Sequence, residues 1–410
     1  MNISKKRRGV PQGPDLTPDT LFELDTYEFS KRKCLSISNS IYDLLGIASP
    51  ITIAVKIAQK ELFSPEHKLG WDTPLTVELA GRWREIAKVL VIIKKVTFPR
   101  RFQPREAKCE DYIVVSFWDG SDEAFSCVLY GRWMVGDGEY KAGLIASKAR
   151  VSPNWSKNTP RSELNGAVLL TRLLVRVIRA FDIKPSKVVI AGDSETILAA
   201  REKEGKYFNE YFSNRVGETW DNQRKIEELS PVGTGGEWFH VPSLQNPADK
   251  CTRSDISMAE VGEGSVWQEG PDYLSLPEDQ WPLERNFATR KGKVSIPMEE
   301  VAKKYKDQFP VNQISITFEK LEDLDKKLKC FKVKAASDSL VQHEYILEHF
   351  QGGFCTNSWS ELLRRTGFLF RWFLRLVRVK QNVIITEKEM ATTFWINIAM
   401  PATRKALAEG

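Results

Sequence analysis

The chain has 410 residues, of which 42% are hydrophobic and 28% charged, and Lys plus Arg exceed Asp plus Glu by 60 to 54. This balance is typical of a globular protein of two or three domains and excludes a collagen-like, low-complexity or wholly disordered chain. The small positive excess is compatible with nucleic-acid binding but does not by itself indicate it. Six cysteines without a CxxC pair favour reduced thiols over a disulfide framework, so we expect an intracellular protein, cytoplasmic or nuclear.

Neither a membrane span nor a secretory signal is predicted. The most apolar stretch, residues 362–379, is interrupted by five arginines. The N-terminal run MNISKKRRGV is basic, but no apolar segment follows it. We therefore expect no membrane partner and no secretion.

The first 110 residues are predicted to be largely helical. Residues 34–59 are apolar and are expected to turn at Gly46 and Pro50, and residues 75–94 show a second helical pattern that ends before Pro99. This region lacks clustered carboxylates. We expect it to supply no catalytic group.

The middle of the chain alternates strands and helices. Apolar runs at 111–118, 125–133 and 140–151 predict an antiparallel meander, which a long helix at 160–181 follows. A strand at 187–191, helical material to residue 229 and a strand at 237–241 complete the series. This order predicts a mixed α/β fold with a partly parallel sheet. Beyond residue 255 the pattern is broken by Pro and Gly, and further helices are predicted at 358–378 and 387–407.

Four carboxylates stand at the ends of these elements. Asp119 ends the first strand and Asp193 the fourth, Glu163 lies in the first turn of the long helix, and Asp249 follows the last strand. Because the first and fourth strands would be neighbours, their ends bring Asp119 and Asp193 together, and the helix can deliver Glu163. Clustered carboxylates repel one another unless cations neutralise them, and hard oxygen ligands suit Mg²⁺ or Mn²⁺.

Five motifs follow one another between residues 111 and 281: WDGSDEAFSCVLY, LIASKARVSPNWSKNTPRSELNGAVLLTRLL, VIAGDSETIL, YFSNRVGE and WFHVPSLQNPADKCTR. Together they resemble the ribonuclease H region of BEL/Pao-type retroelement polyproteins, and GPDYLSLPEDQWP resembles the tail that follows it. The resemblance implies a ribonuclease H-like mixed sheet with flanking helices. It also implies that the Asp, Glu, Asp, Asp set of ribonucleases H corresponds to Asp119, Glu163, Asp193 and Asp249.

The resemblance extends to both sides of this region. KRKCLSISNSIYDLLGIASPITIAVKIAQKELF, GWDTPL and FPRRF resemble the segment between the reverse-transcriptase palm and ribonuclease H, whereas LLRRTGFLFRWFLRLV and TEKEMATTFW resemble the stretch leading to the integrase. It implies a helical connection over 1–110, a ribonuclease H-like domain over 111–258 and a mainly helical linker over 259–410. The chain has no Asp-Asp dipeptide for a polymerase, and no CxxC follows His343 and His349 to build an integrase zinc module.

The function that the resemblance implies is endonucleolytic cleavage of RNA in RNA/DNA hybrids, with two Mg²⁺ or Mn²⁺ ions as cofactors. The expected partners are the hybrid and the other parts of the polyprotein, namely the palm and the integrase. Selectivity would come from the 2′-hydroxyl and the shape of the groove. Arg161, Asn165 and Lys250 lie near the acidic positions and are candidate substrate-binding residues.

Two alternatives remain open. The same family region is also catalogued as a Pao retrotransposon peptidase, but an aspartic peptidase would need a DTG or DSG motif. The sequences around Asp119 (DGS) and Asp193 (DSE) do not fit that motif. The second alternative is a catalytically inactive, nucleic-acid-binding remnant of a retroelement. His240, in WFHVP, is expected to be a hydrogen-bonded strand histidine rather than a proton shuttle.

Overall fold

The computed structural model describes residues 25–337, except 40, 94, 100, 108–110, 154–157, 231–235, 256–257 and 286–293. Residues 1–324 form one compact unit, and residues 325–410 form a second, of which only the end of helix α10 (Phe318–Ser337) is described. The predicted helices at 358–378 and 387–407, together with His343 and His349, lie outside the described residues.

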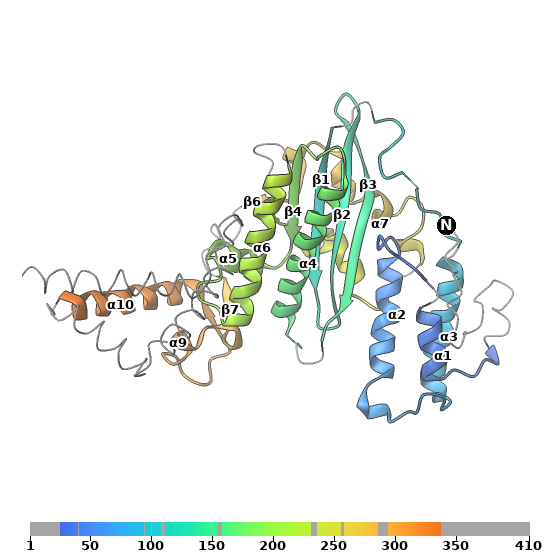
Figure 1. The fold of residues 1–410 in the computed structure, drawn as a ribbon, viewed down its shortest axis with the longest axis horizontal. Coiled ribbons are helices and arrows are strands. Elements are labelled where there is room, and N and C mark those ends of the chain that lie inside the picture. Colours follow the sequence, from blue (N-terminus) through green and yellow to red (C-terminus); the bar gives the residue numbers. More distant parts are fainter. Residues whose placement is uncertain are drawn as a thin grey trace, which may run out of the picture. The chain divides into compact units, whose positions relative to one another are not determined.

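The centre of the first unit is a six-stranded sheet with the strand order β3-β2-β1-β4-β5-β6 (Figure 1). Its strands are β1 (Tyr112–Gly120), β2 (Ala124–Gly136), β3 (Glu139–Val151), β4 (Lys187–Gly192), β5 (Glu237–His240) and β6 (Glu284–Arg285). β1 pairs antiparallel with β2 and parallel with β4, and β4 pairs parallel with β5. The predicted meander and the mixed sheet are thus confirmed.

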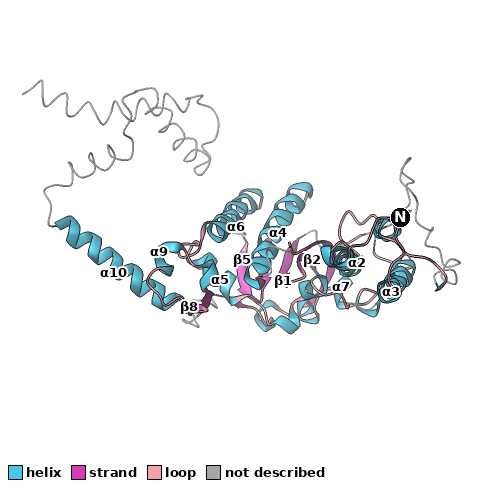
Figure 2. Cartoon of the chain, turned by 90° about the horizontal axis from the view of Figure 1, so that it is seen from below, coloured by secondary structure: helices cyan, strands magenta, loops and turns pink. Residues whose placement is uncertain are grey.

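One face of the sheet is covered by α4 (Thr159–Ala180), α5 (Glu195–Glu202) and α6 (Glu210–Leu229). Helix α4 begins at its cap Asn158 with a proline in the first turn, where the fixed backbone angle of proline suits a helix start. Its buried side includes Leu164, Leu170 and Leu174, and it packs against α6 and against β1 and β2. Figure 2 shows α4 and α6 together on this side of the strands.

The other face packs against an apolar core that includes residues of α1 (Lys31–Ser38), α2 (Ser49–Leu62), α3 (Val77–Ile93), η6 (Pro247–Cys251) and α7 (Val266–Glu269). Phe117 and Tyr130 of the sheet share this core with Trp83 and Trp267. The predicted N-terminal helices are confirmed, and the chain turns at Gly46, whose φ is +77°. Pro50 is not a turn residue, because it stands in the first turn of α2.

After β6, residues 294–318 form a small substructure within the first unit, here called the attachment. It contains the strand pair β7 (Ser295–Pro297) and β8 (Ser315–Thr317), with η10 (Met298–Glu300) and α9 (Lys303–Lys306) between them. Aromatic contacts, among them Tyr207 with Tyr305 at 5.5 Å, fix it to the loop between α5 and α6. None of the described helices has the length and apolar character needed to cross a membrane.

Candidate active site

Two of the four predicted carboxylates lie at the ends of neighbouring parallel strands. Trp118 of β1 pairs with Gly192 of β4, so the residues that follow them, Asp119 and Asp193, stand next to each other at the carboxyl edge. Adjacent strands are about 4.8 Å apart. Because side chains alternate between faces, Asp119 follows Phe117 toward the core side of the sheet, and it is only 8% exposed.

A pair of glycines brings Glu163 to the same edge. A Cβ on Gly120 would lie 2.2 Å from the backbone nitrogen of Glu163, and a Cβ on Gly166 would lie 2.4 Å from the carbonyl oxygen of Asp119. No side chain fits in either place, so the N-terminal part of α4 lies directly against the end of β1. The backbone of Glu163 therefore lies beside the end of β1, next to Asp119.

The segment around η6 brings Asp249 and two polar partners to the other carboxylates. Thr252 donates a hydrogen bond to Asp119 Oδ2 at 2.5 Å and a second one to the carbonyl oxygen of Asp249 at 3.0 Å. Asn246, the cap of η6, donates to Asp193 Oδ1 at 3.4 Å. The structure thus places all four predicted carboxylates around one end of β1 and β4, with Asp249 at its margin.

The pKa values of Asp119, Glu163 and Asp249 are raised, first by burial and then by neighbouring carboxylates. Burial is the largest cause of the raised pKa of Asp119, to about 6, and of Glu163, to about 7, and the charge of Asp193 adds to both. Hydrogen bonds oppose these shifts, among them the one that Ser194 donates to Glu163 Oε2 at 2.6 Å. The pKa of Asp249 is also raised by burial, and Arg253, whose guanidinium lies 2.7 Å from its carboxylate, partly offsets this.

The donor set fits a hard divalent cation, because carboxylate oxygens are the ligands that Mg²⁺ and Mn²⁺ prefer and because protein groups offset the repulsion within the cluster only in part. Among the described residues, however, no three His, Cys, Asp or Glu side chains are already arranged as a metal site. Instead, Asp119, Glu163, Asp193 and Asp249 are each hydrogen-bonded or paired to a protein group. Metal binding would therefore exchange some of these partners for the ion.

The three candidate substrate-binding residues all have partners within the protein. Arg161 Nε donates to Glu300 at 2.6 Å, and Lys250 Nζ donates to Glu260 at 3.0 Å. Asn165 accepts hydrogen bonds from two side chains of α6. Their contacts with a nucleic acid stay predictions.

Sequence reasoning missed the residues that orient the carboxylates, namely Ser194, Asn246 and Thr252. A sequence pattern was present for two of them. Ser194 directly follows Asp193 and caps α5, and Asn246 precedes a proline, which is typical of a cap or a turn. Thr252 has no such pattern, because its contact with Asp119 spans 133 positions along the chain.

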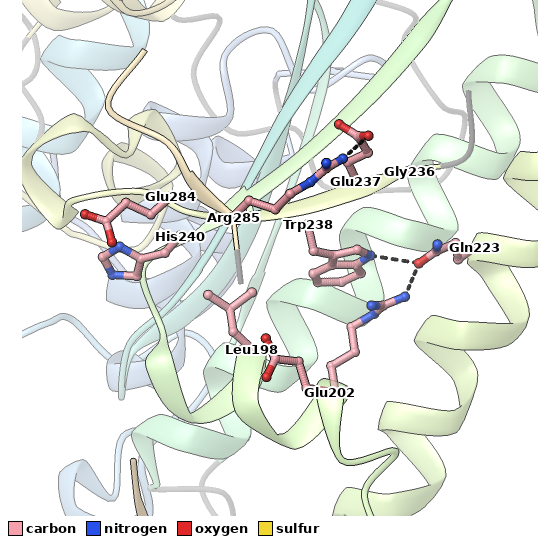
Figure 3. A pocket seen from close by; sticks show the side chains of 10 residues that line it. Leu198, Glu202, Gln223, Gly236, Glu237, Trp238, His240, Glu284 and Arg285 are labelled. Carbon is pink, nitrogen blue, oxygen red and sulfur yellow. Dashed lines mark hydrogen bonds and ion pairs between the residues drawn. The ribbon is translucent and has the colours of Figure 1, made fainter. Parts of the chain in front are cut away.

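A pocket of about 210 Å³ lies on the opposite, helix-covered face, lined by residues of α5, α6, β5 and β6 (Figure 3). His240 lines it from β5 and is paired with Gly192, so its side chain points away from the face that carries Asp119 and Asp193. Arg201, also in the lining, lies between the rings of two tryptophans, 3.8 Å and 4.2 Å from their centroids. This pocket is separate from the carboxylate cluster.

Comparison with known families finds a match for one part of the chain. Residues 30–194 match the model of the Pao retrotransposon-like RNaseH-like domain. The resemblance to Pao-type elements is therefore confirmed over these residues, which include Asp119, Glu163 and Asp193 but not Asp249. Together with the observed sheet order, the match confirms the predicted ribonuclease H-like fold.

Solved structures similar to the chain include the N-terminal RNase H domain of a Mycobacterium tuberculosis protein, determined as a fusion with maltose-binding protein. It is 12% identical over 34% of this chain and 91% of that one, with a TM-score of 0.25. RNase H1 from the halophilic archaeon Halobacterium salinarum NRC-1 is 12% identical over 34% of this chain and 92% of its own, with a TM-score of 0.23. No curated protein matches the chain.

Proposed function

We propose that this protein is a metal-dependent ribonuclease H that cleaves the RNA strand of RNA/DNA hybrids. The observation that carries the proposal is the meeting of Asp119, Glu163 and Asp193 at the carboxyl edge of β1 and β4, where burial and then the neighbouring charges raise the pKa values of Asp119 and Glu163. The family match over residues 30–194 supports it.

Each carboxylate has a distinct role in this proposal. Asp119 and Asp193 would hold both ions, Glu163 would hold one of them, and Asp249 would complete the site of the other. When bound, two Mg²⁺ or Mn²⁺ ions supply an activated water and stabilise the charge on the leaving oxygen of the phosphodiester. Asp249 forms an ion pair with Arg253. This pair must loosen before the carboxylate of Asp249 can serve as a metal ligand.

The neighbouring polar groups hold the carboxylates in position. Thr252 donates to one oxygen of Asp119, and Ser194 donates to one oxygen of Glu163. Since the pKa of Glu163 is about 7, this side chain is partly protonated at neutral pH until a cation displaces the proton. Cleavage is therefore expected to increase between pH 6 and pH 8.

The proposed substrate class is an RNA/DNA hybrid, distinguished by the 2′-hydroxyl and the groove shape rather than by sequence. Arg161, Asn165 and Lys250 remain candidates for contacts with the backbone. Within a retroelement, the palm and integrase regions of the same polyprotein are the proposed partners. The inactive-remnant alternative differs only in catalysis, so an activity measurement separates the two.

The test is a gel of end-labelled RNA/DNA hybrid incubated with the wild type or with Asp193→Asn, in Mg²⁺, Mn²⁺ or EDTA. The wild type should cut the RNA strand only with a divalent cation and should leave an RNA/RNA duplex intact. Asp193→Asn keeps the size of the side chain but removes a negative ligand, so cleavage should fall about 100-fold while hybrid binding in EDTA persists.

Glu123→Gln is the matched control, because Glu123 is an exposed carboxylate in the turn after β1. It should cleave at the wild-type rate. A wild type that is inactive with both ions, or an Asp193→Asn variant that is as active as the wild type, would refute the enzyme and leave the inactive remnant.

A further inference from the structure

A buried glutamate outside the predicted site holds the start of the helix that carries Glu163. Glu300 belongs to η10 in the attachment of residues 294–318, and its exposed fraction is 0%. Its carboxylate accepts hydrogen bonds from Arg161 Nε at 2.6 Å, from Asn158 Nδ2 at 2.9 Å and from Asn209 Nδ2 at 2.9 Å. Three donors from two helix starts thus meet on one side chain.

The two asparagines are the N-caps of α4 and α6. The side-chain oxygen of Asn158 accepts from the backbone of Arg161, and that of Asn209 accepts from the backbone of Phe212 at 3.0 Å. Each cap therefore has its amide group left to donate, and Glu300 receives a bond from both. A carboxylate at two helix N-termini is also favoured by the partial positive charge of those ends.

The backbone around Glu300 is fixed as well. The carbonyl oxygen of Glu300 accepts from the backbone N–H of Asn209 at 2.7 Å, and the N–H of Ala302 donates to the carbonyl oxygen of Tyr207 at 2.8 Å. Tyr305 packs its ring against Tyr207. Glu300 is therefore presented to Arg161 by an anchored segment and not by a free loop.

The position of Arg161 connects this contact to the candidate active site. Arg161 lies in the first turn of α4 and Glu163 follows two residues later, just past that turn, where its backbone nitrogen lies directly against Gly120. Two further hydrogen bonds hold the start of α4, one from Thr159 to Asp122 and one between the hydroxyls of Ser162 and Ser152. In both, the side chain that α4 contributes is uncharged. Arg161 in this turn forms an ion pair with Glu300, and the carboxylate of Glu300 is fully buried.

We propose that Glu300 is a positioning residue for Glu163: through Arg161 and Asn158 it sets where α4 begins and so where the Glu163 carboxylate reaches the metal-binding edge. This inference rests on the proposed function. It makes residues 294–318, which lie beyond the family match, a part of the nuclease. Glu300 itself touches neither substrate nor metal.

The test uses the full chain and the variant Glu300→Gln, which keeps the shape but loses the charge. Calorimetric titration with Mn²⁺ should show about tenfold weaker binding, and single-turnover cleavage should fall between ~10-fold and ~100-fold, because small errors in position are costly. Hybrid affinity in EDTA should not fall by more than about twofold, since Glu300 is fully buried and the substitution removes none of the proposed substrate contacts.

The matched control is Glu218→Gln. Glu218 binds Arg172 through both oxygens and joins the same two helices, but at an exposed place farther along α4. Mn²⁺ affinity and cleavage by this variant should equal those of the wild type. If they fall as far as in Glu300→Gln, loosening of the helix pair in general is responsible and the positioning role is refuted.

A double variant, Arg161→Gln with Glu300→Gln, separates position from stability. The double variant leaves no isolated buried charge, so its melting temperature should recover toward that of the wild type. Its Mn²⁺ affinity should stay low, because the start of α4 has lost its ion pair. Wild-type Mn²⁺ affinity in both Glu300 variants, with an active wild type, would overturn the positioning role and leave the proposed function intact. A wild type that neither binds Mn²⁺ nor cleaves would overturn both.

Discussion

Glu300 and Asp119 are both buried carboxylates, but their surroundings differ: Glu300 lies among hydrogen-bond donors and Asp119 lies among other carboxylates. Glu300 is 0% exposed and is surrounded by a guanidinium and two amide groups. Asp119 is 8% exposed, and burial, followed by the charges of Asp193 and Asp249, raises its pKa to about 6, although the hydroxyl of Thr252 donates a hydrogen bond that opposes the shift. A carboxylate that serves the fold is neutralised by the protein itself. One left among other carboxylates needs a proton or a cation from outside.

The largest effect on stability is expected at Glu300. Replacing it in Glu300→Ala removes the acceptor of three donors and leaves the guanidinium of Arg161 without its partner. The free energy of unfolding should fall by about 3 kcal/mol. Denaturant titration at pH 8 with EDTA measures the change. A loss below about 1 kcal/mol would show that the two kinds of buried carboxylate do not differ as described.

The opposite sign is expected at Glu163. In Glu163→Gln a neutral amide replaces a carboxylate whose pKa is about 7, so at pH 8 without metal the repulsion with its neighbours disappears. The free energy of unfolding should rise by about 2 kcal/mol, while Mg²⁺-dependent cleavage is lost. The same denaturant titration, run beside a cleavage assay, checks both. A destabilised Glu163→Gln would mean that the carboxylate serves the fold as Glu300 does.

A smaller and more gradual effect should appear with pH. Asp119 and Glu163 have raised pKa values in the folded protein, so the folded state binds protons more tightly than the unfolded state does. Their contribution to stability is therefore greatest below about pH 4 and is lost as the pH rises through about 6 to 7.

Between pH 5 and pH 8 the metal-free wild type should lose about 1–2 kcal/mol of stability relative to the double variant Asp119→Asn with Glu163→Gln. Thermal melts of both proteins across this range give the difference, in which all other titrating groups cancel. Addition of Mg²⁺ at pH 8 should restore the wild type. Parallel curves for the two proteins would contradict the raised pKa values.

The elements around the site were predictable because they are buried on both faces. The apolar run at 111–118 became β1 (Tyr112–Gly120), and the run at 187–191 became β4 (Lys187–Gly192). Two adjacent parallel strands necessarily end at the same edge, so the meeting of Asp119 and Asp193 followed from strand order alone. The helix pattern placed Glu163 in the first turn of the long helix, whereas in the structure it lies just past the first turn of α4, which begins at Thr159.

The parts that escaped prediction depend on contacts between distant residues. Strand β6 has two residues and β7 three, too few for an alternating pattern. Glu300 is one of 54 acidic residues, and its partners Asn158 and Asn209 precede it by 142 and 91 positions. No local pattern marks such a residue, because its role arises only when the attachment of residues 294–318 meets the starts of α4 and α6.

The distance between Glu163 and Glu300 along the chain also has a consequence for synthesis. The second residue follows the first by 137 positions (300 minus 163), and a ribosome adds about 5–20 residues per second. Helix α4 therefore leaves the ribosome roughly 7–30 s before the glutamate that ties down its first turn. During that interval the nascent chain holds β1 to β3 and Glu163 and adds the later strands, but it lacks the ion pair of Arg161, so the protein would mature in two stages, first the sheet and then the helix start.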